Sequence, residues 1–284
     1  MYKRQVIICV GYDLVEYHPY LWHPSRDRCI VHIDHSPAET DGHYPVAVGV
    51  VGDIKHSLDR IAGLTTPHQG AHVRPLRERL VEEMDQHRDD LEFPVKPQKI
   101  IWDLRTALDL EDIVVCDVGA HKMWMARMFR CEHPNTCIIS NGFASMGIAV
   151  PGAIAAKLVY PQRHVVAVTG DAGFMMNSQE IETAIRCKLP IVILIWNDSS
   201  YGLIEWKQMN QFQRISNVRF ENPDFVAYAE SFGARGYRVE RTADLPAILK
   251  AALANDTVSI IDCPVDYREN IKLTDQLGTL VCPT

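Results

Sequence analysis

The sequence lacks an apolar run that could cross a membrane, an excess of basic residues and a secretion signal. A membrane-spanning helix needs about 20 apolar residues, and no stretch approaches that length. The formal net charge of −7, from 29 basic and 36 acidic residues, argues against a nucleic-acid or anionic-membrane partner. The start, Met1-Tyr-Lys-Arg-Gln, and the short apolar stretch after it are too brief and too quickly polar for a signal peptide. We therefore expect a cytoplasmic protein with neither a membrane nor a nucleic acid as partner.

Cysteine and histidine patterns typical of structural metal sites are also missing. None of the eight cysteines forms a Cys-x-x-Cys pair, and several lie inside apolar runs, which favours reduced, buried thiols. Twelve histidines are present, but those near His18 and His32 lack the ligand spacing of a zinc site. No Gly-x-Gly-x-x-Gly turn follows the first strand of a β-α-β unit, which argues against a nicotinamide-binding domain.

The chain does contain an alternation of buried strands and helices. Helical patterns cover residues 177–187, 223–232 and 244–254, and Asn222 is predicted to cap the second of them, with Pro223 at its first position. This alternation predicts an α/β fold with a parallel sheet flanked by helices. Apolar runs typical of buried strands occupy residues 6–10, 29–33, 46–51, 113–116, 164–169, 191–196 and 258–263.

A charged segment without a strand signal divides the chain. Residues 66–97 include a charged, helix-like stretch at 74–90, and we predict that they connect residues 1–65 to residues 98–284. Residues 1–65 hold few strands for an independent domain, and the first strand begins almost at Met1. We therefore favour a chain cut inside a domain over a natural split subunit, because a cut domain exposes unpaired strand edges.

Two aspartates follow neighbouring predicted strands. One strand ends in Gly170-Asp171-Ala172-Gly173, and the next ends in Asn197-Asp198. The carboxyl ends of parallel strands form the ligand-binding edge of such sheets. Small residues there let the backbone approach a phosphate, and carboxylates suit Mg²⁺. Either aspartate alone would favour a turn or cap role, but the two together predict a diphosphate held through a metal.

The stretch from Gly170 to Asp198 resembles the signature of thiamine-diphosphate enzymes, which is Gly-Asp-Gly, about two dozen residues, and an Asn pair. Trp196-Asn-Asp-Ser-Ser-Tyr is most similar to the catabolic, FAD-independent branch of acetolactate synthase. The resemblance covers the second half of a central domain at about residues 7–64 and the diphosphate-binding domain from about residue 97 onward. Further similar segments are Asp117-Val-Gly-Ala-His-Lys-Met-Trp, Ser140-Asn-Gly-Phe-Ala-Ser-Met-Gly, Phe174-Met-Met-Asn-Ser-Gln-Glu-Ile-Glu-Thr-Ala and Cys263-Pro-Val-Asp-Tyr-Arg-Glu-Asn-Ile.

This resemblance implies that thiamine diphosphate and Mg²⁺ are bound. The metal ligands would be the side chains of Asp171 and Asp198 and the main-chain carbonyl of Ser200. Met146 would hold the cofactor in a bent shape, and the alternative is that Met146 only fills a gap in the core. The cofactor contacts would be Gly119, Ala120, His121, Ala144, Ser145, Met146, Gly170, Asp171, Ala172, Gly173, Asp198, Ser200, Tyr201 and Gly202.

Three residues depart from the family pattern. Ala172 replaces a glycine, and because its Cβ disfavours positive φ we expect a tighter turn or a displaced phosphate. Lys122 replaces a glutamine and would either offset the charge of Asp198 or be a surface lysine. Lys207 stands where the catabolic branch has glutamine near the substrate, which bears on specificity for pyruvate.

The implied activity is acetolactate synthesis, the condensation of two pyruvates with loss of CO₂, in an acetoin or branched-chain amino acid pathway. The family's activating glutamate comes from a pyrimidine-binding domain, and no segment here resembles that domain; Glu82-Glu83 lacks the required surroundings. We expect the chain alone to be inactive and to need a pyrimidine-binding domain or subunit, or a homo-oligomer. The alternatives are another thiamine-diphosphate carboligase or decarboxylase of 2-oxo acids, and a module that only binds the cofactor.

Overall fold

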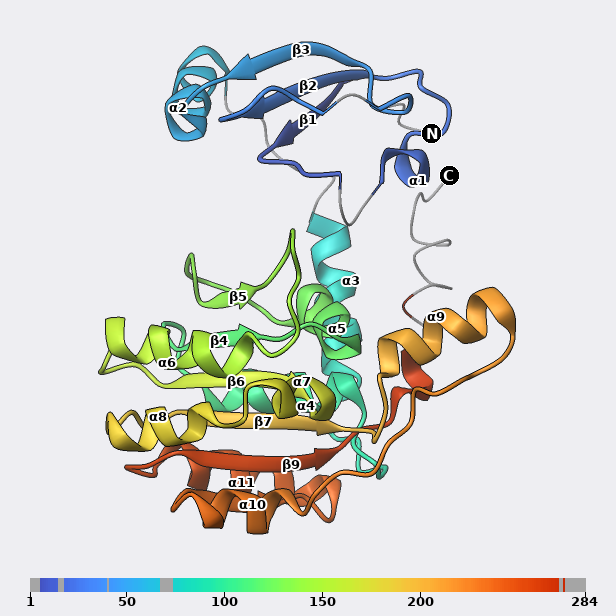
Figure 1. Ribbon diagram of the computed structural model, residues 1–284. Coiled ribbons are helices and arrows are strands. Elements are labelled where there is room, and N and C mark those ends of the chain that lie inside the picture. The colour runs from blue at the N-terminus through green and yellow to red at the C-terminus, as the bar shows by residue number, and fades with distance from the viewer. Residues whose placement is uncertain (1–5, 15–17, 40, 67–73, 271–272, 274–284) are drawn as a thin grey trace. The chain divides into compact units, whose positions relative to one another are not determined.

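The computed structural model describes residues 6–14, 18–39, 41–66, 74–270 and 273, which form two compact units that divide after Arg74 (Figure 1). Within these ranges, no helix has both the length and the apolar character that a bilayer span requires.

The first unit contains a parallel sheet in the order β1-β2-β3. Cys9, Ile30 and Tyr44 form its small buried core. The helix α2 begins after Asp53, whose side chain accepts a hydrogen bond from the backbone N of His56 at 2.6 Å. The elements of this unit are β1 (Val6–Val10), α1 (Pro19–Trp22), β2 (Cys29–Asp34), β3 (Val46–Val51) and α2 (Ile54–Leu64).

The second unit is built on a larger parallel sheet, with the strands in the order β5-β4-β6-β7-β9-β8 (Figure 1). Every pairing in it is parallel. The strands are β4 (Ile113–Cys116), β5 (Cys137–Ile139), β6 (Val165–Gly170), β7 (Val192–Asn197), β8 (Arg235–Arg238) and β9 (Ser259–Pro264).

Helices cover both faces of this sheet because alternate residues of each strand point to opposite sides. In β4, for example, Val114 and Cys116 belong to one buried cluster, whereas Ile113 and Val115 belong to the other. The first cluster packs against α4, α5 and α11, and the second against α6, α7, α8 and α10. The helices of this unit are α3 (Arg74–Asp85), α4 (Pro97–Ala107), α5 (Ala120–Met128), α6 (Ala149–Val159), α7 (Asp171–Met176), α8 (Glu180–Arg186), α9 (Gly202–Phe212), α10 (Phe225–Ser231) and α11 (Leu245–Leu253), with 3₁₀ turns at Thr242–Asp244 and Tyr267–Asn270.

The strand order contains a reversal beside β4. The chain passes from β4 to β5 on one side and then returns across β4 to β6 on the other. In open parallel sheets, ligands bind at such a reversal, outside the carboxyl ends of the strands. The segments after β4 and β6 are therefore the expected walls of a ligand site.

The predicted α/β class, with parallel sheets flanked by helices, is confirmed, and each predicted strand lies in an observed strand or overlaps one. Two edge strands were not predicted. β5 has only three residues, and β8 (Arg-Gly-Tyr-Arg) has no apolar run, so neither carries a local signal.

The predicted cap of α10 is wrong. Asp224, not Asn222, caps this helix, because the Asp224 side chain accepts hydrogen bonds from the backbone N of Val226 and of Ala227. The prediction of buried cysteines is only partly confirmed, although the described cysteines are all free thiols. Cys9, Cys116 and Cys263 are buried, Cys137 is half-buried, Cys29, Cys131 and Cys187 are exposed, and Cys282 lies outside the described residues.

Candidate cofactor and metal site

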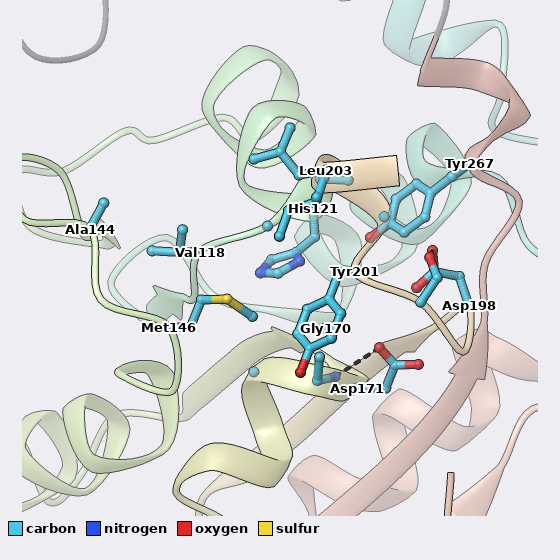
Figure 2. A pocket seen from close by; sticks show the side chains of 17 residues that line it. Val118, His121, Ala144, Met146, Gly170, Asp171, Asp198, Tyr201, Leu203 and Tyr267 are labelled. Carbon is cyan, nitrogen blue, oxygen red and sulfur yellow. Dashed lines mark hydrogen bonds between the residues drawn. The ribbon is translucent and has the colours of Figure 1, made fainter. Parts of the chain in front are cut away.

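A pocket of about 230 Å³ lies at the carboxyl ends of β4, β6 and β7. Met146 extends into it from one wall, and Asp171 and Asp198 lie at the opposite side (Figure 2). The lining residues are Val118, Gly119, Ala120, His121, Ala144, Met146, Gly170, Asp171, Ala172, Gly173, Asp198, Ser200, Tyr201, Gly202, Leu203, Ile204 and Tyr267.

The turn after β4 brings backbone to the pocket because Gly119 has no side chain. Its φ of 163° is ordinary extended backbone, so space rather than conformation requires glycine here. A Cβ at this position would lie 2.6 Å from Cε1 of His121. Helix α5 begins at the next residue, and the N–H groups of a first helical turn have no partner within the helix. Such a turn is suited to bind an anion.

Asp171 is the first residue of α7, and its carboxylate accepts hydrogen bonds at both oxygens. Its Oδ1 accepts from the backbone N of Ala172 at 2.8 Å. Its Oδ2 accepts from the backbone N of Ser199 and from Nδ2 of Asn222, each at 2.7 Å. Burial raises the pKa of this carboxyl, and the hydrogen bonds oppose that effect. Asp171 is therefore a buried acid with a fixed orientation.

Asp198 follows β7 and faces the same pocket. Burial raises its pKa to about 7; the charge of Asp171 raises it too, while a hydrogen bond from Oγ of Ser200 at 2.7 Å lowers it. Ser199, which lies between Asp198 and Ser200, has a φ of 54°, in the left-handed region that residues other than glycine rarely adopt. Gly202 leaves room beside the acid, because a Cβ there would lie 2.7 Å from Oδ2 of Asp198.

The two carboxylates lie close together in a pocket whose described lining provides no lysine or arginine to balance their charge. Nor do the described residues include three His, Cys, Asp or Glu side chains grouped to hold a metal ion. A cation at Asp171 and Asp198 would thus complete its shell with main-chain, phosphate or water oxygens, which is how Mg²⁺ is usually bound.

The loop that carries Ala144 and Met146 is anchored by Asp117. This fully buried carboxylate accepts the Gly147 N–H with both oxygens, at 2.8 and 3.0 Å, and the hydroxyl of Thr169 at 3.2 Å. Ala144 has a φ of 49°, so the loop holds a strained residue at the pocket wall. Met146 is half-buried, lines the pocket and lies outside the buried clusters of the described residues.

Two buried polar atoms of the lining side chains lack a partner among the described residues. They are Nε2 of His121 and the hydroxyl of Tyr267. Burial lowers the pKa of His121 to about 4, so its imidazole is neutral near pH 7. Burial, followed by the charges of Asp198 and Asp171, raises the pKa of Tyr267. Because buried polar groups normally have partners, these two atoms fit a polar ligand in the pocket.

The structure brings all the predicted site residues except Ser145 to this pocket. Ser145 lies between two lining residues, but its side chain is exposed. Val118, Leu203, Ile204 and Tyr267 also line the pocket and were not predicted. Tyr267 belongs to the predicted segment that begins at Cys263, so its motif was noticed but its side chain was not assigned.

The three departures from the family pattern have different outcomes. Ala172 lies in the first turn of α7 and is not among the residues with positive φ, so its backbone is one that alanine readily adopts. The expected tighter turn or displaced phosphate stays a prediction. Lys122 is buried and its Nζ donates to the carbonyl of Ser140 at 3.2 Å, so its interpretation as a surface lysine is wrong. That its charge offsets Asp198 stays a prediction. Lys207 is exposed on α9 and does not line the pocket.

The family described as thiamine pyrophosphate enzyme, C-terminal TPP binding domain, matches residues 117–263. This range includes Asp117, Met146, Asp171 and Asp198, the residues on which the geometry of the pocket depends.

Three curated relatives extend this similarity along the chain. Acetolactate synthase of Bacillus subtilis (strain 168) is 39% identical over 281 residues, which is 95% of this chain and 48% of that protein. Catabolic acetolactate synthase of Raoultella terrigena is 37% identical over 281 residues, or 97% and 50% of the two chains. A probable acetolactate synthase large subunit of Methanocaldococcus jannaschii is 32% identical over 262 residues, or 88% and 44%. The chain thus spans about half the length of the curated relatives it matches.

Proposed function

Because the chain belongs to the thiamine pyrophosphate enzyme family, we propose that it forms the cofactor-binding part of an acetolactate synthase that uses thiamine diphosphate and Mg²⁺. The reaction condenses two pyruvates with loss of CO₂. When bound, thiamine diphosphate supplies the nucleophilic carbon and the electron sink for this chemistry. The observation that carries the proposal is a pair of neighbouring carboxylates, the buried Asp171 and the half-buried Asp198, in a pocket whose described lining has no lysine or arginine.

The residues present fit a metal-bound diphosphate. Asp171 and Asp198 would hold Mg²⁺ together with the main-chain carbonyl of Ser200. The backbone at Gly119 and the first turn of α5 would contact the diphosphate. The neutral imidazole of His121 lies in the pocket with a buried nitrogen that lacks a partner among the described residues, which also fits a polar ligand (Figure 2).

Met146 would support the cofactor in its bent shape. A flexible, apolar side chain that extends into the pocket can fill the space beneath a bound ring. Its place outside the buried clusters of the described residues favours this role over that of a core gap-filler.

The activating acid would come from outside this pocket. No glutamate is among its described lining residues, and Glu83 pairs instead with Arg127 at 3.0 Å. We therefore propose that a pyrimidine-binding domain or subunit, or a second copy of the protein, completes the active site.

The test begins with calorimetric binding of thiamine diphosphate to the chain, with Mg²⁺ and with a chelator. We expect binding that requires Mg²⁺ and that Asp171→Ala abolishes. Asp256→Ala, which removes an exposed aspartate outside the pocket, is the matched control and should bind like wild type. Binding of equal strength in the chelator would contradict the proposed metal site.

Incubation with pyruvate then separates the candidate activities. Acetolactate as product supports the proposed synthase, whereas acetaldehyde supports a decarboxylase instead. Binding without turnover supports a cofactor-binding part that needs a partner.

A further inference from the structure

Asn222 touches the proposed metal site from outside the pocket. It lies between α9 and α10, is half-buried, and is not a lining residue. Its Nδ2 donates to Oδ2 of Asp171 at 2.7 Å and to Oδ1 of Asn197 at 3.0 Å. One amide group therefore connects the acid that follows β6 to the end of β7, directly before Asp198.

The orientation of this amide follows from its neighbours. Nδ2 of Asn222 faces the carboxylate of Asp171 and the side-chain carbonyl of Asn197, with the hydroxyl of Ser199 farther away at 3.4 Å. The reverse orientation would place Oδ1 of Asn222 against both the carboxylate and the carbonyl. In the observed orientation, Oδ1 is buried and finds no partner among the described residues. A buried acceptor without a partner costs free energy. The hydrogen bonds donated by Nδ2, and none accepted by Oδ1, therefore hold the Asn222 side chain in this orientation.

A chain of polar contacts continues from Asn197 and holds the amide in place. Nδ2 of Asn197 donates to Oδ1 of Asp262 at 2.8 Å, and Nε of Arg238 donates to the other oxygen of Asp262 at 3.2 Å. The guanidinium of Arg238 also donates to Asp224 at 2.7 Å, and Asp224 caps α10 two residues after Asn222. Asn222 is thus fixed through its side chain and through the helix cap that follows it.

We infer that Asn222 is a positioning residue that orients the Asp171 carboxylate, and with it the turn of Asp198, for binding a divalent cation. This inference rests on the proposed function. Oδ2 of Asp171 accepts from the Ser199 N–H and from the Asn222 amide, and removing the amide would leave the carboxylate with main-chain donors. The carboxylate would then be held less firmly in its orientation toward the turn of Asp198. Loss of such a supporting hydrogen bond typically weakens metal affinity about 10- to 100-fold.

The test measures binding of Mn²⁺, as a paramagnetic substitute for Mg²⁺, by electron paramagnetic resonance at saturating thiamine diphosphate. For Asn222→Ala, we expect the dissociation constant of Mn²⁺ to rise about 10-fold or more, with binding restored at high Mn²⁺. Asn222→Leu keeps a similar side-chain volume but has no N–H group. It should show the same rise, which separates the lost hydrogen bond from lost packing.

Asn255→Ala is the matched control. Nδ2 of Asn255 also donates two short hydrogen bonds, to the hydroxyls of Tyr237 (2.7 Å) and Ser259 (2.8 Å). Asn255 lies near the amino-terminal end of β9, away from the carboxyl ends that form the pocket. Its removal should lower the melting temperature and leave Mn²⁺ binding unchanged.

Folded Asn222→Ala and Asn222→Leu that bind Mn²⁺ within about twofold of wild type would overturn the inference and leave the proposed function intact. A wild-type chain that does not retain Mn²⁺ with thiamine diphosphate would overturn both.

Discussion

His121 makes the stability of the second unit depend on pH. Its side chain is 2% exposed, and burial lowers its pKa to about 4, compared with 6.5 for a free histidine. Between these values the unfolded chain binds a proton that the native state does not. The contribution of neutral His121 to stability is therefore complete above pH 6.5, and it is lost as the pH falls towards 4.

The size of this effect follows from the shift in pKa. The fall of the pKa from 6.5 to about 4 corresponds to about 3 kcal/mol, the limit reached well below pH 4. Between pH 7.5 and pH 5.0, the native state should lose about 2 kcal/mol of its free energy of unfolding through this single group.

The assay is urea denaturation at the two pH values, without cofactor or metal. It is followed by tryptophan fluorescence, since four of the five tryptophans lie in the second unit. His121→Gln and His121→Phe remove the titrating group in two different ways. Each variant should lose about 2 kcal/mol less than wild type between pH 7.5 and 5.0, even though the absolute stabilities of the two differ. Parallel losses in wild type and both variants would refute the assignment of a buried, neutral imidazole.

Three further predictions concern the walls of the pocket. Gly202→Ala places a Cβ 2.7 Å from Oδ2 of Asp198, so calorimetry should show that thiamine diphosphate and Mg²⁺ bind at least about tenfold more weakly. Gly63→Ala is the control, because its added Cβ has nothing within 4 Å, and it should leave this affinity unchanged. Asp117→Ala removes the acceptor of the Gly147 and Val118 N–H groups, so urea denaturation should show a loss of about 3 kcal/mol. A loss below about 1 kcal/mol would contradict the anchoring role. Met146→Ala should reduce pyruvate turnover by the complete enzyme. It should cost less than about 2 kcal/mol of stability, because the side chain is only half-buried. A larger loss of stability with normal turnover would identify Met146 as a packing residue instead.

Much of the fold could be predicted because its signals are local. The strands β4, β6, β7 and β9 are mostly apolar, since parallel strands covered by helices on both faces bury nearly all their side chains. Asp171 and Asp198 were predicted to face one site because both follow such strands, whose carboxyl ends form a single edge of the sheet.

The prediction for Asn222 failed for a physical reason. An asparagine before a proline has the local signature of a helix cap, and the sequence pattern contains nothing that distinguishes a cap from a side chain used elsewhere. Asp224 takes the cap instead, and the amide of Asn222 is then available to Asp171, which lies 51 positions earlier in the chain.

The sequence by itself determined the fold class, the family and nearly all of the residues around the pocket, because apolar runs and short motifs are properties of neighbouring residues. Only the tertiary structure decided the strand order, the anchoring of the Met146 loop by Asp117, and the contact between Asn222 and Asp171. These features join residues from about 30 to 50 positions apart, and such contacts form only when the sheet and its helices are packed together.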